Sequence, residues 1–194
     1  MKTKYSIWTV AFALLIIASC KKSSTSQART LQGTWNFEYE QVHTQSTIEY
    51  TSGATDYKTV TVSNYTTANN YGQLNVTSTM MNSIGLTYTI TDTAIGYNYQ
   101  NGAFVDSTIS IQNAAVPATN TNSSYVLVGS DSVYFPAGSF NTPSGYQTAG
   151  GARINISGDT LLTITTSFNR DSSIFIYGVP ATANYQATLI SKFN

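Results

Sequence analysis

Apolar and polar residues alternate with a period of two through most of the chain from residue 34 onward. Trp35, Phe37 and Tyr39 alternate with polar neighbours, and the stretch 84–90 repeats the pattern. Because successive side chains of a strand point to opposite faces, this period predicts half-buried β-strands. No segment of this part has a convincing helical period, so the pattern predicts an all-β domain.

Clusters of glycine, asparagine, aspartate and serine separate the predicted strands. Asn101-Gly102 is the strongest hairpin signal, because both turn positions of such a hairpin need a positive φ. Further turn signals lie at 129–132, 158–159 and 169–172, and a long loop, a rim or a lid, is expected between 135 and 151. This spacing predicts eight to ten antiparallel strands in a barrel or a sandwich. Few charges are available to protect sheet edges, which favours the closed barrel.

The beginning of the chain predicts export and membrane attachment. A basic start and an apolar stretch too short to span a bilayer are typical of a signal peptide, predicted over residues 1–19. The run Ile17-Ala18-Ser19-Cys20 resembles the lipobox of bacterial lipoproteins, and the resemblance implies that Cys20, the only cysteine, becomes lipidated. Residues 20–32 then form the lipidated cysteine with a flexible tether, and residues 33–194 form a single antiparallel β domain.

Composition and the first residues after Cys20 narrow the location and the partners. Only 9% of residues are charged, against about 25% in a typical protein, so a neutral ligand suits the surface better than a charged one. The net charge of zero gives no basic patch for a nucleic acid. Lys21 follows Cys20 directly, where an aspartate is linked in some bacteria to retention in the inner membrane, and this favours the outer membrane. The tethers of surface-exported lipoproteins tend to be acidic, so the basic Lys21-Lys22 favours a periplasm-facing position. We expect a monomer without a cofactor.

The first predicted strand carries a recognisable motif. Gly33-Thr34-Trp35 resembles the Gly-x-Trp of lipocalins and of lipocalin-like envelope lipoproteins of the Bacteroidota type, and the stretch 156–164 is similar to their late hairpins. The resemblance implies an antiparallel barrel with Trp35 at its closed end and Lys192 packed over it. It also implies non-catalytic binding of a small apolar or amphipathic ligand inside the barrel. A β-sandwich remains the alternative, in which Trp35 is a large core residue.

Alternation places a row of side chains on the inner face of the first strand. Continuing the parity of Trp35 and Phe37 brings Tyr39, Gln41 and His43 to the same face, which becomes more polar toward its end. Such a row fits a pocket with an apolar base and a wetter mouth, or a strand that runs out into solvent. The predicted ligand-binding residues are Phe37, Tyr39, His43, Tyr88, Tyr97 and Tyr99.

Tyr97 and Tyr99 also suggest a second kind of binding. Beside the Asn101-Gly102 turn they could form an aromatic platform for sugars. The alternative function is therefore a glycan- or protein-binding β-sandwich lipoprotein of the cell envelope.

Catalytic and metal chemistry are not indicated. His43 is the only histidine, no His/Cys cluster exists for zinc, and no Gly-x-Ser-x-Gly run is present. Glu38 and Glu40 share a face opposite the aromatic residues and are expected to point into solvent. We therefore predict no catalytic residue, no metal site and no enzyme activity.

Four aspartates are followed by Ser or Thr, and the third residue of the triplet is Ala94, Thr108, Val133 or Leu161. These triplets resemble the O-glycosylation sequon of Bacteroidota envelope proteins, and the predicted sites are Thr93, Ser107, Ser132 and Thr160. Ordinary turn chemistry is the alternative, because Asp and Ser side chains bond to nearby backbone in turns.

Overall fold

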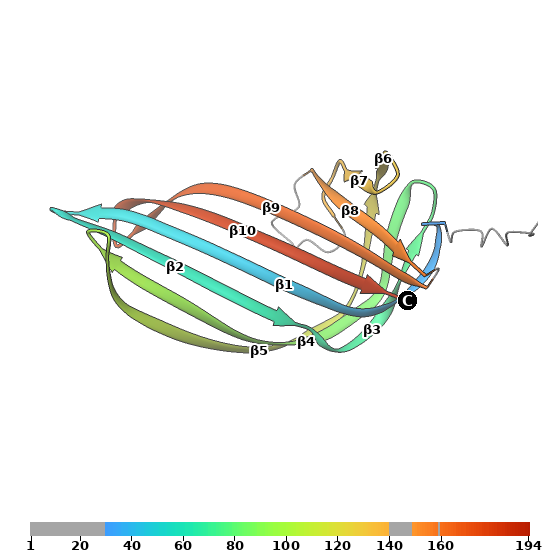
Figure 1. Cartoon of the computed structure of the whole chain (residues 1–194), viewed down its shortest axis with the longest axis horizontal. Helices are drawn as coiled ribbons and strands as arrows, with labels where there is room; N and C mark the ends of the chain where they lie inside the picture. Colours follow the sequence, from blue (N-terminus) through green and yellow to red (C-terminus); the bar gives the residue numbers. More distant parts are fainter. Residues whose placement is uncertain (1–29, 140–148, 159) are drawn as a thin grey trace, which may run out of the picture.

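The computed structural model describes residues 30–139, 149–158 and 160–194, and this part of the chain consists of strands and turns without a helix. All strand pairings are antiparallel, which confirms the all-β prediction. The predicted signal peptide, Cys20, most of the tether and the centre of the predicted loop lie outside the described residues. The strands are β1 (Gly33–Ser52), β2 (Thr55–Thr66), β3 (Ala68–Val76), β4 (Met80–Gln100), β5 (Ala103–Ser124), β6 (Val126–Val128), β7 (Ser132–Phe135), β8 (Gly150–Ser157), β9 (Leu161–Ile176) and β10 (Val179–Phe193) (Figure 1).

The strands form one sheet in which neighbours in sequence are mostly neighbours in space. β2 and β3 are separated only by Thr67 and together lie between β1 and β4, while β1 pairs on its other side with β10. From β10 the sheet continues through β9, β8 and β7 to β6. At the other end of the order, β5 pairs with β4, and the single residue Tyr125 separates β5 from β6. The Tyr125 amide donates to the carbonyl oxygen of Thr79 at 2.9 Å, which fixes this joint.

The hairpin turns test the local turn signals. Asn101 and Gly102 have φ angles of 48° and 79° and join Gln100 directly to its partner Ala103, so the predicted two-residue hairpin is confirmed. The turn expected at 169–172 is wrong, because these polar residues continue β9 and pair with β10. Cross-strand pairing here outweighs the turn preference of the individual residues.

The main hydrophobic core lies at the end of the sheet where the C-terminus is found (Figure 1). Trp35 is fully buried there, and its indole Nε1 donates to the carbonyl oxygen of Leu31 at 3.0 Å. The other fully buried large side chains around it come from five further strands. They are Phe135, Phe193, Leu74, Met81, Leu162 and Ile164.

A β-bulge in the first strand changes which side chains face inward. The register between β1 and β10 shifts between Phe37 and Tyr39, so one extra residue of β1 is accommodated there. Beyond this point Glu40 and Val42 are buried while His43 is exposed. The predicted inward row is therefore wrong from Tyr39 onward, since a one-residue slip moves every later side chain to the other face.

The same shift determines the place of Lys192. Its neighbours Ser191 and Phe193 are buried, whereas the Lys192 Nζ lies 5.1 Å from the ring centroid of Tyr39 on the outer face. The expected packing of Lys192 over Trp35 is therefore wrong, and its ammonium instead makes a cation–π contact with a partly exposed ring.

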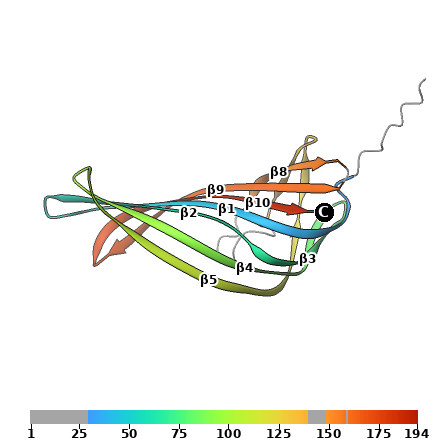
Figure 2. The same ribbon diagram turned by 60° about the horizontal axis from the view of Figure 1, so that its bottom comes forward.

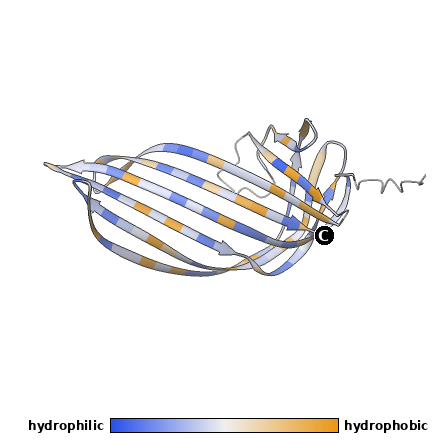
Figure 3. Cartoon of the chain, viewed as in Figure 1, coloured by the Kyte–Doolittle hydropathy of each residue, from blue (hydrophilic) through white to orange (hydrophobic). Residues whose placement is uncertain are grey.

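Away from the core the sheet extends as three long hairpins, β1–β2, β4–β5 and β9–β10. β8 pairs with β9 only as far as Thr166, and beyond it β9 has β10 as its partner. Figure 1 shows β5 and β9 along opposite borders of this region, and Figure 2 shows the ends of the three hairpins diverging. Figure 3 shows hydrophobic and hydrophilic residues alternating along the long strands, in agreement with the period of two in the sequence.

Candidate functional site

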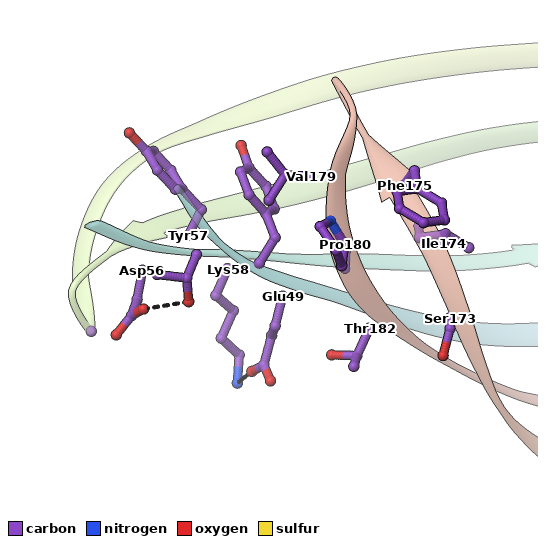
Figure 4. Close-up of a pocket in the computed structure, with 14 residues that line it drawn as sticks. Glu49, Asp56, Tyr57, Lys58, Ser173, Ile174, Phe175, Val179, Pro180 and Thr182 are labelled. Carbon is purple, nitrogen blue, oxygen red and sulfur yellow. Dashed lines mark hydrogen bonds and ion pairs between the residues drawn. The ribbon is translucent and has the colours of Figure 1, made fainter. Parts of the chain in front are cut away.

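A cavity of about 840 Å³ lies at the ends of the long hairpins. On β1 it is at the opposite end of the strand from the core residue Trp35. It is bordered by the β1–β2 and β9–β10 hairpins and touches Gly102 in the turn between β4 and β5 (Figure 4). Apolar and aromatic side chains around it are mixed with polar and charged ones. Those of the two main hairpins are Glu49, Tyr50, Thr51, Asp56, Tyr57, Lys58, Ser173, Ile174, Phe175, Val179, Pro180, Ala181 and Thr182.

Register explains the apolar wall of this cavity. Tyr50 lies opposite Tyr57 on one side and opposite Ala181 on the other, and Ala181 lies opposite Ile174. Directly opposed residues of antiparallel strands share a face, so the four side chains form one row across β2, β1, β10 and β9. The rings of Tyr50 and Tyr57 stack with centroids 4.9 Å apart and an interplanar angle of 11°. We call this set the tip row.

The tip row stands on the same face as the buried core. Tyr50 and Val42 have the same parity on β1, and the pairing between them has no further register shift. Figure 4 shows Tyr57 on one side of the strands and the Lys58–Glu49 pair on the other. The Lys58 ammonium and the Glu49 carboxylate are 2.8 Å apart at the surface. The tip row is therefore the apolar part of the cavity wall, and Glu49 and Lys58 border the cavity from the opposite face of the strands.

Two hairpin ends beside the cavity are tied together. The Asp56 amide donates to the Asn101 side-chain oxygen at 2.9 Å, and the Asn101 amide donates to the Asp56 carbonyl at 2.8 Å. Thr51 Oγ1 also donates to the Asp56 carboxylate at 2.7 Å. These bonds connect the β1–β2 turn to the β4–β5 turn and hold Tyr57 in place.

Sequence reasoning did not identify the tip row. The available signal was a turn around Gly53, which has a φ of 64°, with tyrosines at similar distances on either side. That signal places Tyr50 and Tyr57 on facing strands. It does not bring Ile174 to them, because that contact depends on the pairing of β1 with β10.

The predicted ligand-binding residues separate into three places. Phe37 and Tyr88 meet with ring centroids 6.0 Å apart, and Phe37 also packs on Phe193 at 5.5 Å, so this pair belongs to the main core. Tyr39 lies on the outer face. His43 is exposed there too, where its Nδ1 forms a hydrogen bond with the Asn64 side-chain oxygen.

The remaining predicted ligand-binding tyrosines lie on the outer face of β4. Tyr97 lies opposite Ser107, and the ring of Tyr99 meets Phe104 edge-on with centroids 5.9 Å apart. They do not border the cavity of the tip row. The structure therefore brings only Phe37 and Tyr88 together from the predicted set.

Two carboxylates are buried between the core and the hairpins. Glu40 is 7% exposed and accepts a hydrogen bond from Ser191 Oγ at 2.7 Å, so its expected exposure to solvent is wrong. The β-bulge explains this outcome, since it turns Glu40 inward. Asp92 is 8% exposed and accepts from Ser63 Oγ at 2.7 Å, while its other oxygen has no hydrogen-bond partner among the described residues.

Two tyrosines near these buried carboxylates have raised pKa values. Burial, followed by the nearby Glu40 carboxylate, raises the pKa of Tyr88 to about 12. Burial is also the largest cause that raises the pKa of Tyr65, and Glu40, Tyr88 and Asp92 add to it. Both phenols are therefore held in their neutral form. Within 30–139, 149–158 and 160–194, no group of three His, Cys, Asp or Glu side chains could hold a metal ion.

The predicted glycosylation sites differ in exposure. Thr93, Ser107 and Thr160 are exposed, and the first two lie on the outer face of the β4–β5 hairpin. Ser132 is partly buried, and its hydroxyl donates to the Asp131 carboxylate at 3.0 Å. Modification at these positions stays a prediction.

Comparisons with known proteins add no family to this description. No protein-family model, no curated protein and no solved structure matches the chain. The described part of the chain also holds no helix long and apolar enough to cross a membrane. The site is therefore described by its own geometry.

Proposed function

We propose that this protein binds a small amphipathic molecule, without catalysis, in the cavity beside the tip row. The observation that carries the proposal is the apolar row of Tyr57, Tyr50, Ala181 and Ile174 facing a cavity of about 840 Å³. This volume lies in the range of small-molecule sites, which are mostly apolar with a few polar groups. The stacked tyrosines offer a rigid surface for the apolar part of a ligand.

The polar part of the ligand is expected to be uncharged. Between the tip row and the core, the inner face carries Ser46 opposite Thr61, and Thr59 opposite Asn98, with a hydrogen bond of 2.9 Å between the last two side chains. Hydroxyl and amide groups donate and accept hydrogen bonds without demanding a counter-charge. The Asp106 carboxylate on this face already accepts from Asn98 Nδ2 at 2.7 Å, so a neutral hydroxyl-bearing or amide-bearing head group is the class that this surface suits.

We further propose a lipocalin-like barrel as the scaffold. Two features support it. The chain passes from β5, on β4, through Tyr125 directly into β6, on β7, so one continuous segment joins both ends of the strand order. Trp35 is fully buried among side chains of many strands at the end that this joint borders. In this proposal the end that holds Trp35 is the closed end of the barrel, and the tip row lies at the open end.

A lipid anchor at Cys20 remains part of the proposal. It would hold the domain at the outer membrane, facing the periplasm, where amphipathic molecules are present. Acyl chains on a cysteine give durable anchoring only when more than one is attached.

Glycan binding is the second candidate function, and a specific observation favours it. The hairpin ends that carry the Tyr50–Tyr57 stack also carry Phe175 and Tyr177, which are 74% and 98% exposed. Aromatic faces with hydroxyl neighbours suit sugar rings as well as lipid-like molecules. The test below separates the two classes.

The test uses native mass spectrometry and a fluorescent probe. This chain, purified from its own envelope in mild detergent, should retain a small molecule of defined mass. The fluorescent probe N-phenyl-1-naphthylamine should bind to the protein. The double variant Tyr50→Ala/Tyr57→Ala should weaken probe binding by about tenfold or more, since two aromatic contacts contribute over 1 kcal/mol. Tyr71→Ala, at an exposed position on β3, is the matched control. Unchanged probe affinity in the double variant overturns the site. Envelope oligosaccharides bound in place of the probe favour the second candidate.

A further inference from the structure

The free edge of β5 is long, regular and exposed. From 106 to 116 it pairs with β4 without interruption. No described strand pairs with its other side. Every residue from 103 to 115 is exposed. Such an edge presents a row of unpaired N–H and C=O groups, which is a template for another strand.

Between 106 and 116 this edge has little of the usual protection against pairing, because Pro117 and the register shifts of β5 lie beyond this stretch. Asp106 is the only charged residue of β5, and its carboxylate already accepts from Asn98 Nδ2 at 2.7 Å. Ile109 and Ile111 are 69% and 68% exposed on the outer face. Natural edge strands normally carry charges, prolines or bulges that prevent association. The free edge of β9 beyond Thr166, in contrast, carries charged residues.

We propose that β5 pairs antiparallel with β5 of a second copy, about a two-fold axis at Ser110. The inference is independent of the proposed ligand. Outer-face residues must oppose outer-face residues in such a pair, which restricts the register to steps of two. An axis at Ser110 places Ile109 opposite Ile111 of the second copy, twice by symmetry. Asp106 then lies opposite Ala114, so no like charges meet.

Neighbouring registers are less favourable. An axis at Ile109 would pair Ile111 with Ser107, and an axis at Ile111 would pair Ile109 with Asn113. Each keeps one isoleucine contact where the Ser110 axis makes two. Directly opposed apolar pairs stabilise a sheet, so the Ser110 register is preferred. The dimer replaces the monomer expected from composition.

Cysteine cross-linking tests this register. The full chain carries Cys20→Ser in mild detergent, so an introduced cysteine is the only thiol. Ser110→Cys should form a disulfide-linked dimer under mild oxidation, because opposed Cα atoms lie about 4.5–5.5 Å apart. Ser107→Cys and Asn113→Cys should stay unlinked when separate and should link when mixed. Equal linking of all three single variants, or none in Ser110→Cys, overturns the register.

Native mass spectrometry tests the interface itself. The wild-type chain should be dimeric at micromolar concentration, and Ile109→Lys/Ile111→Lys should weaken the dimer by at least about tenfold, since charges on an edge oppose pairing. Tyr71→Lys, another exposed strand position, is the control and should remain dimeric. A monomeric wild type, or a dimer unaffected by the double variant, overturns the proposal.

Discussion

Raising the pH above 10 should destabilise this protein through two phenols that resist ionisation when folded. The pKa of Tyr88 rises from 10.0 to about 12 because its ring is buried and faces Glu40. Between these values the unfolded chain has lost the Tyr88 proton and the folded chain still holds it. The free energy of unfolding therefore falls as the pH rises from 10 to 12, and the contribution is fully present below pH 10.

The magnitude follows from the separation of the two pKa values. A difference of two corresponds to at most about 2.7 kcal/mol. Tyr88 is only partly buried, and solvent screening reduces this to about 1 kcal/mol. Tyr65 acts in the same direction, because burial, Glu40 and Asp92 all raise its pKa. Together the two phenols should remove about 2 kcal/mol between pH 10 and pH 12.

Denaturant unfolding at about pH 8 and about pH 11.5 measures this loss. Tyr65→Phe and Tyr88→Phe keep the ring and remove the ionising hydroxyl, so each should lose less stability over this range than the wild type. Tyr177→Phe is the control, because Tyr177 is 98% exposed. This variant should lose as much stability over the same pH range as the wild type. If the two buried variants lose as much stability as the Tyr177 variant, the electrostatic argument is wrong.

Four substitutions test the packing of the sheet. Gly72→Ala should cost at least about 2 kcal/mol in denaturant unfolding, because its φ is 112° and the new Cβ would lie 2.6 Å from the Gly85 carbonyl oxygen. Gly102→Ala, with a φ of 79° and open space, should cost about 1–2 kcal/mol, and an equal loss would contradict the steric argument. Trp35→Ala should cost about 3–5 kcal/mol in the same assay, and a loss below about 1 kcal/mol would place Trp35 outside the core. Asp92→Asn should raise the melting temperature by a few degrees, because it removes a buried charge and keeps an acceptor; a lower melting temperature would show that the charge is needed.

Local pattern was sufficient for the strands and for the turns after β4 and β6, where Val128 pairs with Ser132 around Gly129. The period of two predicts β1 and β4, and Asn101-Gly102 predicts the hairpin after β4 because only a few residues accept positive φ. These features depend on residues that are close in sequence. The stretch 169–172 shows the limit, because its turn preference is overridden by pairing with β10.

The site depended on contacts that are distant in sequence. The inward position of Glu40 results from a bulge that exists only because β1 pairs with β10. The tip row brings Tyr50 to Ile174 through the same pairing. Alternation predicts that one face is inward, but a single inserted residue reverses that face, and no residue type in the sequence marks the insertion.

The pairing of the first strand with the last also governs how the molecule can form. Phe37 on β1 lies opposite Phe193 on β10, so contacts of the core join the two ends of the domain. The core therefore cannot be completed before β10 is available to pair with β1. Folding dominated by such long-range pairs is slow, on the scale of milliseconds to seconds. A truncation that removes β10 should therefore leave β1 and β9 without the strand that joins them, and the shortened chain should not reach the native fold.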